Sequence, residues 1–296
     1  MHNRRKNRKR FIAILIFVQV AIVFVIYVFP IFWMGITSLK TKVQIFDPKP
    51  TIFFEPTASN YKVFFGFKET GEVGAGERAG GSTKTFKRAF INSVAITCSS
   101  TLLALILGTM AGYVLSRYQM KAKNDLMFFI LSTRMLPPIV ALVPISLLFT
   151  NIGLKDTFLG FVLLYTNFNL AFSVWIMKGF FDDVPFAFEE AAMCDGYPRL
   201  RAFFKVVLPM VTNGLAATAI FCGIMIWNEY VFAIVLGSKK WTLMPPTIFA
   251  NSSGTTGIIW GVLATSSLLY VLPVIIFTYL IRKQLLRGVT FGVIRG

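Results

Sequence analysis

The chain has 296 residues, of which 55% are hydrophobic and only 15% are charged. Soluble domains carry roughly 25% charged residues, so this composition excludes an ordinary soluble protein and predicts an integral membrane protein. The net charge of +17 does not indicate nucleic-acid binding, because the basic residues lie mainly between long apolar runs. Three cysteines, at positions 98, 194 and 222, are too few and too scattered for a disulfide framework or a metal site.

Apolar runs long enough to cross a bilayer occur six times along the chain. A spanning helix needs roughly 20 predominantly apolar residues. The stretches that qualify are 11–36, 90–118, 126–150, 157–177, 211–236 and 258–281. They predict an all-α membrane protein with a basic N-terminus at 1–10, a long loop at 37–89 and a tail at 282–296.

The distribution of basic residues predicts the orientation of these spans. Six basic residues precede the first span, whose apolar run of about 26 residues exceeds the 7–15 of a signal-peptide core. An uncleaved anchor with a cytoplasmic N-terminus is therefore expected, and six spans then place both termini in the cytoplasm. The inside segments carry 17 Lys and Arg and the outside loops 12, in agreement with the positive-inside rule.

A glycine-rich tract at 71–82 is typical of flexible polypeptide. Gly76 and Gly81 have the separation found in a phosphate-binding loop. The residues that follow are Ser82 and Thr83, where such a loop needs a lysine and a hydroxyl, and no strand is expected before them. The sequence therefore predicts no nucleotide site, so that an ATP-driven function requires another polypeptide.

The segment between the fourth and fifth spans, 178–210, is too polar to lie within the lipid and contains helix signals that a disordered segment would lack. Pro185 suits the first turn of a short helix over 186–194, and Gly196 ends it where a left-handed residue is favoured. Pro198 then begins a second helix that stops near Pro209. The pattern alone fits either an amphipathic helix pair lying on the membrane or a short helix that protrudes to engage a partner.

The motifs in this segment resemble a known family. Glu190-Ala191-Ala192, followed by Gly196 and by Leu208-Pro209, resembles the EAA coupling motif of binding-protein-dependent ABC importer permeases. The fuller pattern Glu-Glu-Ala-Ala-x-x-Asp-Gly is similar to the carbohydrate branch. The C-terminal residues 287–296 resemble the end of the second permease subunit of maltose-type transporters, and 227–230 resemble a frequent sugar-permease sequence. The resemblance covers most of the chain from Asn60 onward.

This resemblance implies the type I ABC importer permease fold, with six transmembrane helices and a cytoplasmic coupling helix between the fourth and fifth. The permease core would be 90–281 and the coupling loop 178–210. The loop would insert into a cleft on a cytoplasmic ATPase subunit, and the tail 288–296 would contact the ATPase dimer unless it is frayed. The implied coupling residues are Glu190, Ala191, Ala192, Asp195 and Gly196.

The resemblance also implies a function and a set of partners. The chain would be the permease subunit of an importer for carbohydrate, such as maltodextrin or a related oligosaccharide, in a bacterial or archaeal cell (inner) membrane. It would be no enzyme and hold no cofactor, because ATP and Mg²⁺ belong to the ATPase. The other partners would be a second homologous permease, an extracytoplasmic solute-binding protein, the sugar and membrane lipid. Candidate docking residues for the binding protein are Lys239, Lys240 and Trp241.

Two other classes of protein compete with this interpretation. An ion-coupled secondary sugar transporter needs intramembrane acids and repeated halves with broken helices. Glu229 is the one acidic candidate within the predicted spans, and no convincing internal repeat is found. A membrane-bound enzyme lacks any catalytic constellation in a common compartment.

Ionisable residues inside spans are costly and therefore functional candidates. Arg134 and Glu229 differ in depth by roughly 15 Å, which excludes a mutual ion pair. Arg134 precedes a kink expected at Pro137-Pro138, and either snorkels or anchors the coupling loop. Glu229 either lines an outer gate or is solvated near the mouth.

The fourth span carries amides beside aromatic residues near mid-membrane. Asn167 and Asn169, with Phe168 and Phe172, suit either a sugar path or hydrogen bonding between helices. In the second span, the spacing of Gly108 and Gly112 predicts close helix packing.

Overall fold

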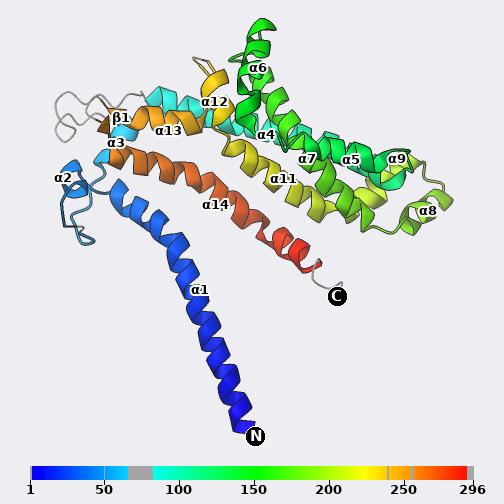
Figure 1. Ribbon diagram of the computed structural model, residues 1–296, viewed down its shortest axis with the longest axis horizontal. Coiled ribbons are helices and arrows are strands. Elements are labelled where there is room, and N and C mark those ends of the chain that lie inside the picture. Colours follow the sequence, from blue (N-terminus) through cyan, green and yellow to red (C-terminus); the bar gives the residue numbers. More distant parts are fainter. Residues whose placement is uncertain (1, 50, 66–82, 239, 255–256, 292–296) are drawn as a thin grey trace. The chain divides into compact units, whose positions relative to one another are not determined.

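The computed structural model is helical almost throughout and describes residues 2–49, 51–65, 83–238, 240–254 and 257–291 (Figure 1). The glycine-rich tract 71–82, Lys239 and the last five residues of the predicted tail lie outside these ranges. The chain divides into two compact units, residues 1–83 with 248–272 and residues 84–247 with 273–296. The predicted all-α architecture is confirmed.

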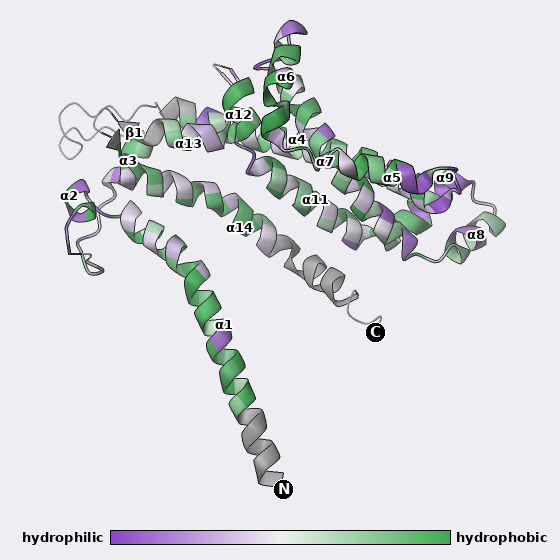
Figure 2. Ribbon diagram, in the orientation of Figure 1, coloured by the Kyte–Doolittle hydropathy of each residue, from purple (hydrophilic) through white to green (hydrophobic). Residues whose placement is uncertain are grey.

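The first unit contains the N-terminal helix and its following loop. Its elements are α1 (His2–Ser38), α2 (Lys42–Ile45), α3 (Ser59–Phe64), part of α13 (Met244–Ser252), an antiparallel pair β1 (Ser253–Gly254) and β2 (Gly257–Ile258), and the start of α14 (Trp260–Phe291). The most apolar window of α1 has no buried residue, and Figure 2 shows a predominantly hydrophobic helix. Such an outward-facing apolar surface suits contact with lipid.

The loop after α1 is fixed to the end of that helix. The Asn60 side-chain amide donates to the carbonyls of Ser38 (2.9 Å) and Lys40 (2.8 Å). The buried Lys40 ammonium donates to the Thr51 carbonyl at 2.6 Å. On α14, Gly261 allows close approach, because a Cβ there would lie 2.3 Å from Asn60 Oδ1. Hydrogen bonds therefore order a segment that the sequence presents only as a long loop.

The second unit is a bundle built around α7 (Phe158–Asp182), twelve of whose residues are buried. The other elements are α4 (Thr83–Arg117), α5 (Lys123–Ser132), α6 (Pro138–Asn151), α8 (Ala187–Cys194), α9 (Arg199–Ala202), the π-helix η1 (Phe203–Val207), α10 (Leu208–Met210), α11 (Thr212–Trp227) and α12 (Val231–Leu236). One apolar cluster surrounds the first half of α7, around Phe161 and Tyr165. A second surrounds its last turns, around Met177 and Phe181. Each end of α7 thus rests on its own core.

Helices α4 and α7 pack closely, as the glycine spacing predicts. A Cβ on Gly108 would lie 2.1 Å from Ser173 Oγ, and one on Gly112 would lie 2.9 Å from the Lys178 backbone nitrogen. Ser173 Oγ donates to the Ala104 carbonyl at 2.9 Å, which joins the two helices further. The small residues therefore let the two backbones approach and hydrogen-bond.

Four of the six predicted spans are single helices in the described part of the chain: Phe11–Ser38, Phe86–Arg117, Phe158–Asp182 and Trp260–Tyr279. The third is interrupted between α5 and α6, so the kink expected at Pro137-Pro138 is a complete break, and the two helices point in different directions in Figure 1. Proline lacks the amide hydrogen and restricts the preceding residue, which explains the break.

The fifth predicted span is also discontinuous. It consists of α11 and α12, separated by residues 228–230, and the helical segment Arg199–Met210 that precedes α11 is bent by 74° from it. The apolar run at 211–236 gives no sign of this interruption, because the residues at the break are held by side-chain contacts from another helix.

Candidate functional site

The segment 178–210, called the EAA loop below, contains the two predicted helices. Helix α8 covers Ala187–Cys194, and Gly196 has the left-handed φ of +85° that glycine adopts without strain. Pro198 precedes a helical segment that runs from Arg199 to Met210. The predicted helix–glycine–helix arrangement is confirmed.

Glu189 fixes α8 to the bundle. Its side chain is fully buried, and its carboxylate pairs with Arg117 Nε at 3.2 Å and with Arg199 Nε at 3.4 Å. The Tyr113 hydroxyl also donates to this carboxylate. Because Tyr113 and Arg117 belong to α4 and Arg199 to α9, one carboxylate ties three helices together.

The two arginines extend this network, which we call the Glu189 cluster (Tyr113, Arg117, Tyr118, Glu189 and Arg199). Arg117 Nη2 donates to the Val184 carbonyl at 3.0 Å. Arg199 Nη1 donates to the Tyr118 hydroxyl at 3.1 Å, and its guanidinium lies 4.8 Å from that ring. Burial opposes the charge of Arg199, but the neighbouring Tyr118 and Tyr113 and its hydrogen bonds raise the Arg199 pKa above its ordinary value. Arg199 therefore remains a cation.

The opposite face of α8 is exposed. Glu190, Ala191, Asp195 and Gly196 are exposed, whereas Ala192 is buried. Residues three apart share a helix face, so Glu189 and Ala192 turn inward together. Figure 1 shows α8 at the tip of the bundle. Four of the five predicted coupling residues thus reach a free surface, and the fifth is a small contact with the bundle.

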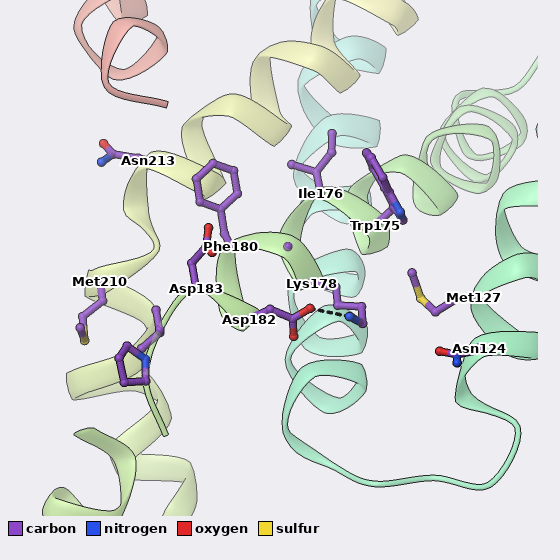
Figure 3. Close-up of a pocket in the computed structure, with 13 residues that line it drawn as sticks. Asn124, Met127, Trp175, Ile176, Lys178, Phe180, Asp182, Asp183, Met210 and Asn213 are labelled. Carbon is purple, nitrogen blue, oxygen red and sulfur yellow. Dashed lines mark hydrogen bonds and ion pairs between the residues drawn. The ribbon is translucent and has the colours of Figure 1, made fainter. Parts of the chain in front are cut away.

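A cavity of about 990 Å³ lies beside the EAA loop, bounded by α5, the end of α7, α10 and α11 (Figure 3). Polar groups line it: Asn124, Lys178, Asp182, Asp183 and Asn213, with the half-exposed indole of Trp175. Lys178 Nζ and Asp182 Oδ2 are 2.5 Å apart, and Figure 3 shows this ion pair at the centre of the view. Hydrogen-bonding groups therefore surround the point where α7 leads into the EAA loop.

At the other end of α7, Asp156 organises the loop 237–243. Its carboxylate accepts hydrogen bonds from the backbone amides of Ser238 (3.1 Å), Lys240 (3.0 Å) and Trp241 (2.8 Å). Asp156 has a φ of +54°, a conformation that Asp and Asn tolerate better than most residues. One side chain therefore sets the path of the loop that carries the predicted docking residues.

The predicted docking residues differ in exposure. Lys240 is exposed, and its carbonyl accepts from the Asn92 amide at 3.4 Å. Trp241 is partly buried and packs against Phe158, with ring centroids 5.2 Å apart and the ring planes tilted by 42°. Lys239 lies outside the described residues. Docking at this loop stays a prediction, with Trp241 serving the loop's own structure as well.

Glu229 stabilises the interruption of the fifth span. Its carboxylate accepts from the Tyr165 hydroxyl at 2.7 Å and from the backbone amides of Phe232 (3.0 Å) and Ala233 (3.1 Å). It therefore caps the N-terminus of α12 and joins it to α7. Arg134 contacts other residues, as the difference in depth predicts.

Asn167 and Asn169 do not form one site. Residues two positions apart in an α-helix point in directions that differ by about 200° around the helix axis. Asn167 is exposed on α7, whereas Asn169 is buried and its amide donates to the Tyr165 carbonyl at 2.8 Å. Their proposed roles in a sugar path thus apply to different surfaces.

Comparison with known proteins gives the family. Residues 104–289 match the model of the binding-protein-dependent transport system inner membrane component, a range that includes the EAA loop. The chain belongs to this family. The permease is 30% identical to a probable ABC transporter permease protein of Sinorhizobium fredii, over 91% of each chain.

Two further comparisons describe its relatives. The permease is 30% identical to the trehalose transport system permease protein of Mycobacterium tuberculosis, over 90% of this chain and 92% of that one. Its fold matches a chain in the crystal structure of a bacterial ABC transporter involved in the import of the acidic polysaccharide alginate, with a TM-score of 0.73. The two chains are 21% identical, and the match covers 93% of this chain and 96% of that one. The predicted permease fold and multi-pass membrane location are thereby confirmed.

Sequence reasoning missed the residues that position these surfaces. Glu189 received no role of its own from the sequence, because nothing in its neighbourhood along the chain distinguishes it from the adjacent Glu190. Arg117 was one of the 17 basic residues assigned to the inside segments and had no other role. Nothing local marks Asp156, because its partners are more than 80 residues away along the chain.

Proposed function

We propose that this permease is the transmembrane subunit of an ATP-driven importer for carbohydrate. It forms half of the translocation pathway with a second, homologous permease, and a cytoplasmic ATPase dimer binds ATP and Mg²⁺. An extracytoplasmic binding protein delivers the sugar. The family membership supports the transport role, and the name of the trehalose permease relative supports the substrate class.

The two faces of α8 are the observation that carries the proposal. Glu189 holds the inner face in a buried network, while Glu190 and Ala191 leave the outer face free for a partner. A carboxylate beside small side chains lets a cationic or amide partner approach closely. Because α8 is tied to both α4 and α9, closure of the ATPase dimer would move these elements as one body.

The same proposal assigns the ends of the bundle to the two sides of the membrane. The EAA loop and both termini face the cytoplasm, and the loop 237–243 faces outward toward the binding protein. The cavity beside the EAA loop then lies at the cytoplasmic end of α7. An ion-coupled carrier is disfavoured, because the Glu229 carboxylate already binds Tyr165 and the start of α12.

Charge reversal at Glu190 tests the function. In proteoliposomes that contain both permeases and the ATPase, with binding protein and sugar outside, Glu190→Lys is expected to lower ATP-driven uptake by at least ~10-fold, since a lost charged contact at a docking surface costs a factor of ten or more. Pull-down of the ATPase by the variant should fall in parallel. Thermal stability of the variant should be unchanged, because Glu190 is exposed.

Asp125→Lys provides the matched control, since Asp125 is an exposed carboxylate on α5 outside the EAA loop. It should leave both uptake and ATPase association unchanged. Full uptake by the Glu190→Lys importer, or uptake driven by an ion gradient without nucleotide, would contradict the proposed function.

A further inference from the structure

A charged side chain lies within the bundle at the interruption between α5 and α6. The Arg134 backbone amide donates to the Leu131 carbonyl at 2.9 Å in the turn after α5. Its guanidinium carbon lies 5.6 Å from the Phe168 ring centroid and 4.8 Å from that of Phe172. Phe168 is ten residues from the start of α7 and Phe172 is ten residues from its end, so each ring is roughly 15 Å along the helix from the nearer end. The cation is therefore at the middle of a spanning helix.

The charge of Arg134 is not balanced by a carboxylate in the part of the chain that the structure describes. Arg117 and Arg199, by contrast, both pair with Glu189. The Nε atom of Arg134 is buried and has no hydrogen-bond partner among the described residues. A cation inside a span is costly unless it is paired, and the attraction of aromatic faces offsets only part of that cost. The position therefore favours an added anion.

The surroundings of Arg134 suit a sugar ring as well as an anion. Phe168 packs against Phe232 and Phe172 against Phe221, but both rings remain partly exposed, and that apolar remainder suits the C–H surface of a pyranose. Between them on α7, Asn169 is 4% exposed, and its Oδ1 has no hydrogen-bond partner within the described ranges. On α11, the Cys222 thiol lies 4.0 Å from the Asn169 backbone carbonyl oxygen. A cation and two aromatic rings thus meet on α7, with an amide oxygen, unpartnered among the described residues, on the same turns of the helix.

We propose that Arg134 binds an oxyanion carried by the transported carbohydrate, such as the carboxylate of a uronic acid, as the sugar passes Phe168 and Phe172. The inference rests on the proposed function and narrows its substrate class to acidic sugars. A guanidinium binds a carboxylate through two parallel hydrogen bonds, which also orients the sugar ring. The partly exposed aromatic faces favour a sugar over a carboxylate of the second permease, which has no need of them.

The test compares two disaccharides that differ only at C6, where one carries carboxylates and the other neutral hydroxymethyl groups. Digalacturonate and the neutral galactobiose of the same linkage are titrated into the assembled importer in nanodiscs. Arg134→Gln is expected to weaken digalacturonate binding by at least ~10-fold, because charge-assisted hydrogen bonds are lost, and to change galactobiose binding by less than about twofold. Arg134→Lys keeps the charge and should recover part of the affinity. Arg88→Gln, at an exposed position on α4, removes a charge elsewhere and should change neither affinity.

Several results would overturn the inference: no digalacturonate binding by the parent importer, equal weakening of both sugars, or no effect of Arg134→Gln. Dissociation of the two permeases in the Arg134→Gln variant, seen by size-exclusion chromatography, would assign the anion to the second permease instead. ATP-driven uptake of galactobiose but not of digalacturonate by the parent importer would leave the proposed function intact while removing the inference. Failure of the Glu190→Lys test would remove the proposed function itself.

Discussion

The Glu189→Ala permease is expected to lose thermal stability and ATP-driven uptake together. Its carboxylate is fully buried and pairs with Arg117 and Arg199, and it also accepts from Tyr113. Removal of one member of a buried ion pair typically costs about 3–5 kcal/mol, because the remaining charge is left buried and unpaired. Here the loss would release α8 from both α4 and α9.

Heating the purified permease and measuring the fraction that stays monodisperse tests the stability part of this prediction. Reconstituted uptake tests the functional part. Glu189→Gln keeps the shape and several hydrogen bonds but removes the charge, so an intermediate loss is expected. The matched control is Glu190→Ala, one residue away on the exposed face of α8.

Variants of the two adjacent carboxylates therefore distinguish attachment of α8 to the bundle from coupling to the ATPase. Glu190→Ala should retain the parental stability while uptake falls, whereas Glu189→Ala should lower both. Equal stability of the two variants would show that the Glu189 cluster does not hold α8.

Asp156→Ala is expected to abolish most of the stimulation of ATP hydrolysis by the sugar-loaded binding protein. Three backbone amides of the loop 237–243 donate to this carboxylate. A typical hydrogen bond contributes about 0.5–1.5 kcal/mol net, so the loss of all three should let the loop leave its present path. Lys240 and Trp241 would then no longer be held in position for the binding protein.

Stimulated and basal ATPase rates of the reconstituted importer measure this effect. Basal hydrolysis should stay near the parental rate, because the EAA loop is at the other end of α7. Lys155→Ala changes the neighbouring exposed side chain and should leave stimulation intact. Normal stimulation of the Asp156→Ala importer would exclude this loop as the docking surface.

The sequence predicts most of the fold because a membrane-spanning helix can be recognised from its own stretch of apolar residues. Long apolar runs and the spacing of Gly108 and Gly112 require no knowledge of distant residues, and neither do the proline and glycine signals that bound α8. The break at Pro137-Pro138 follows from proline chemistry in the same way. These features appear in the structure at or near the expected residues.

Other features depend on contacts between residues far apart in the sequence and cannot be predicted from local sequence patterns. The interruption of the fifth span is stabilised by Glu229 and by Tyr165 from another helix. The Glu189 cluster joins α4 to α8 across more than 70 residues of sequence. Burial of Asn169 and exposure of Asn167 likewise depend on which face of α7 meets its neighbours.

The accessibility of Cys194 tests the central claim most directly. Its thiol is exposed on α8, while Cys222 is buried and Cys98 can be replaced by serine to remove the other exposed thiol. A membrane-impermeant maleimide should label Cys194 in inside-out but not in right-side-out vesicles, and bound ATPase should protect it. Labelling from the outside, or labelling that the ATPase does not reduce, would contradict the account.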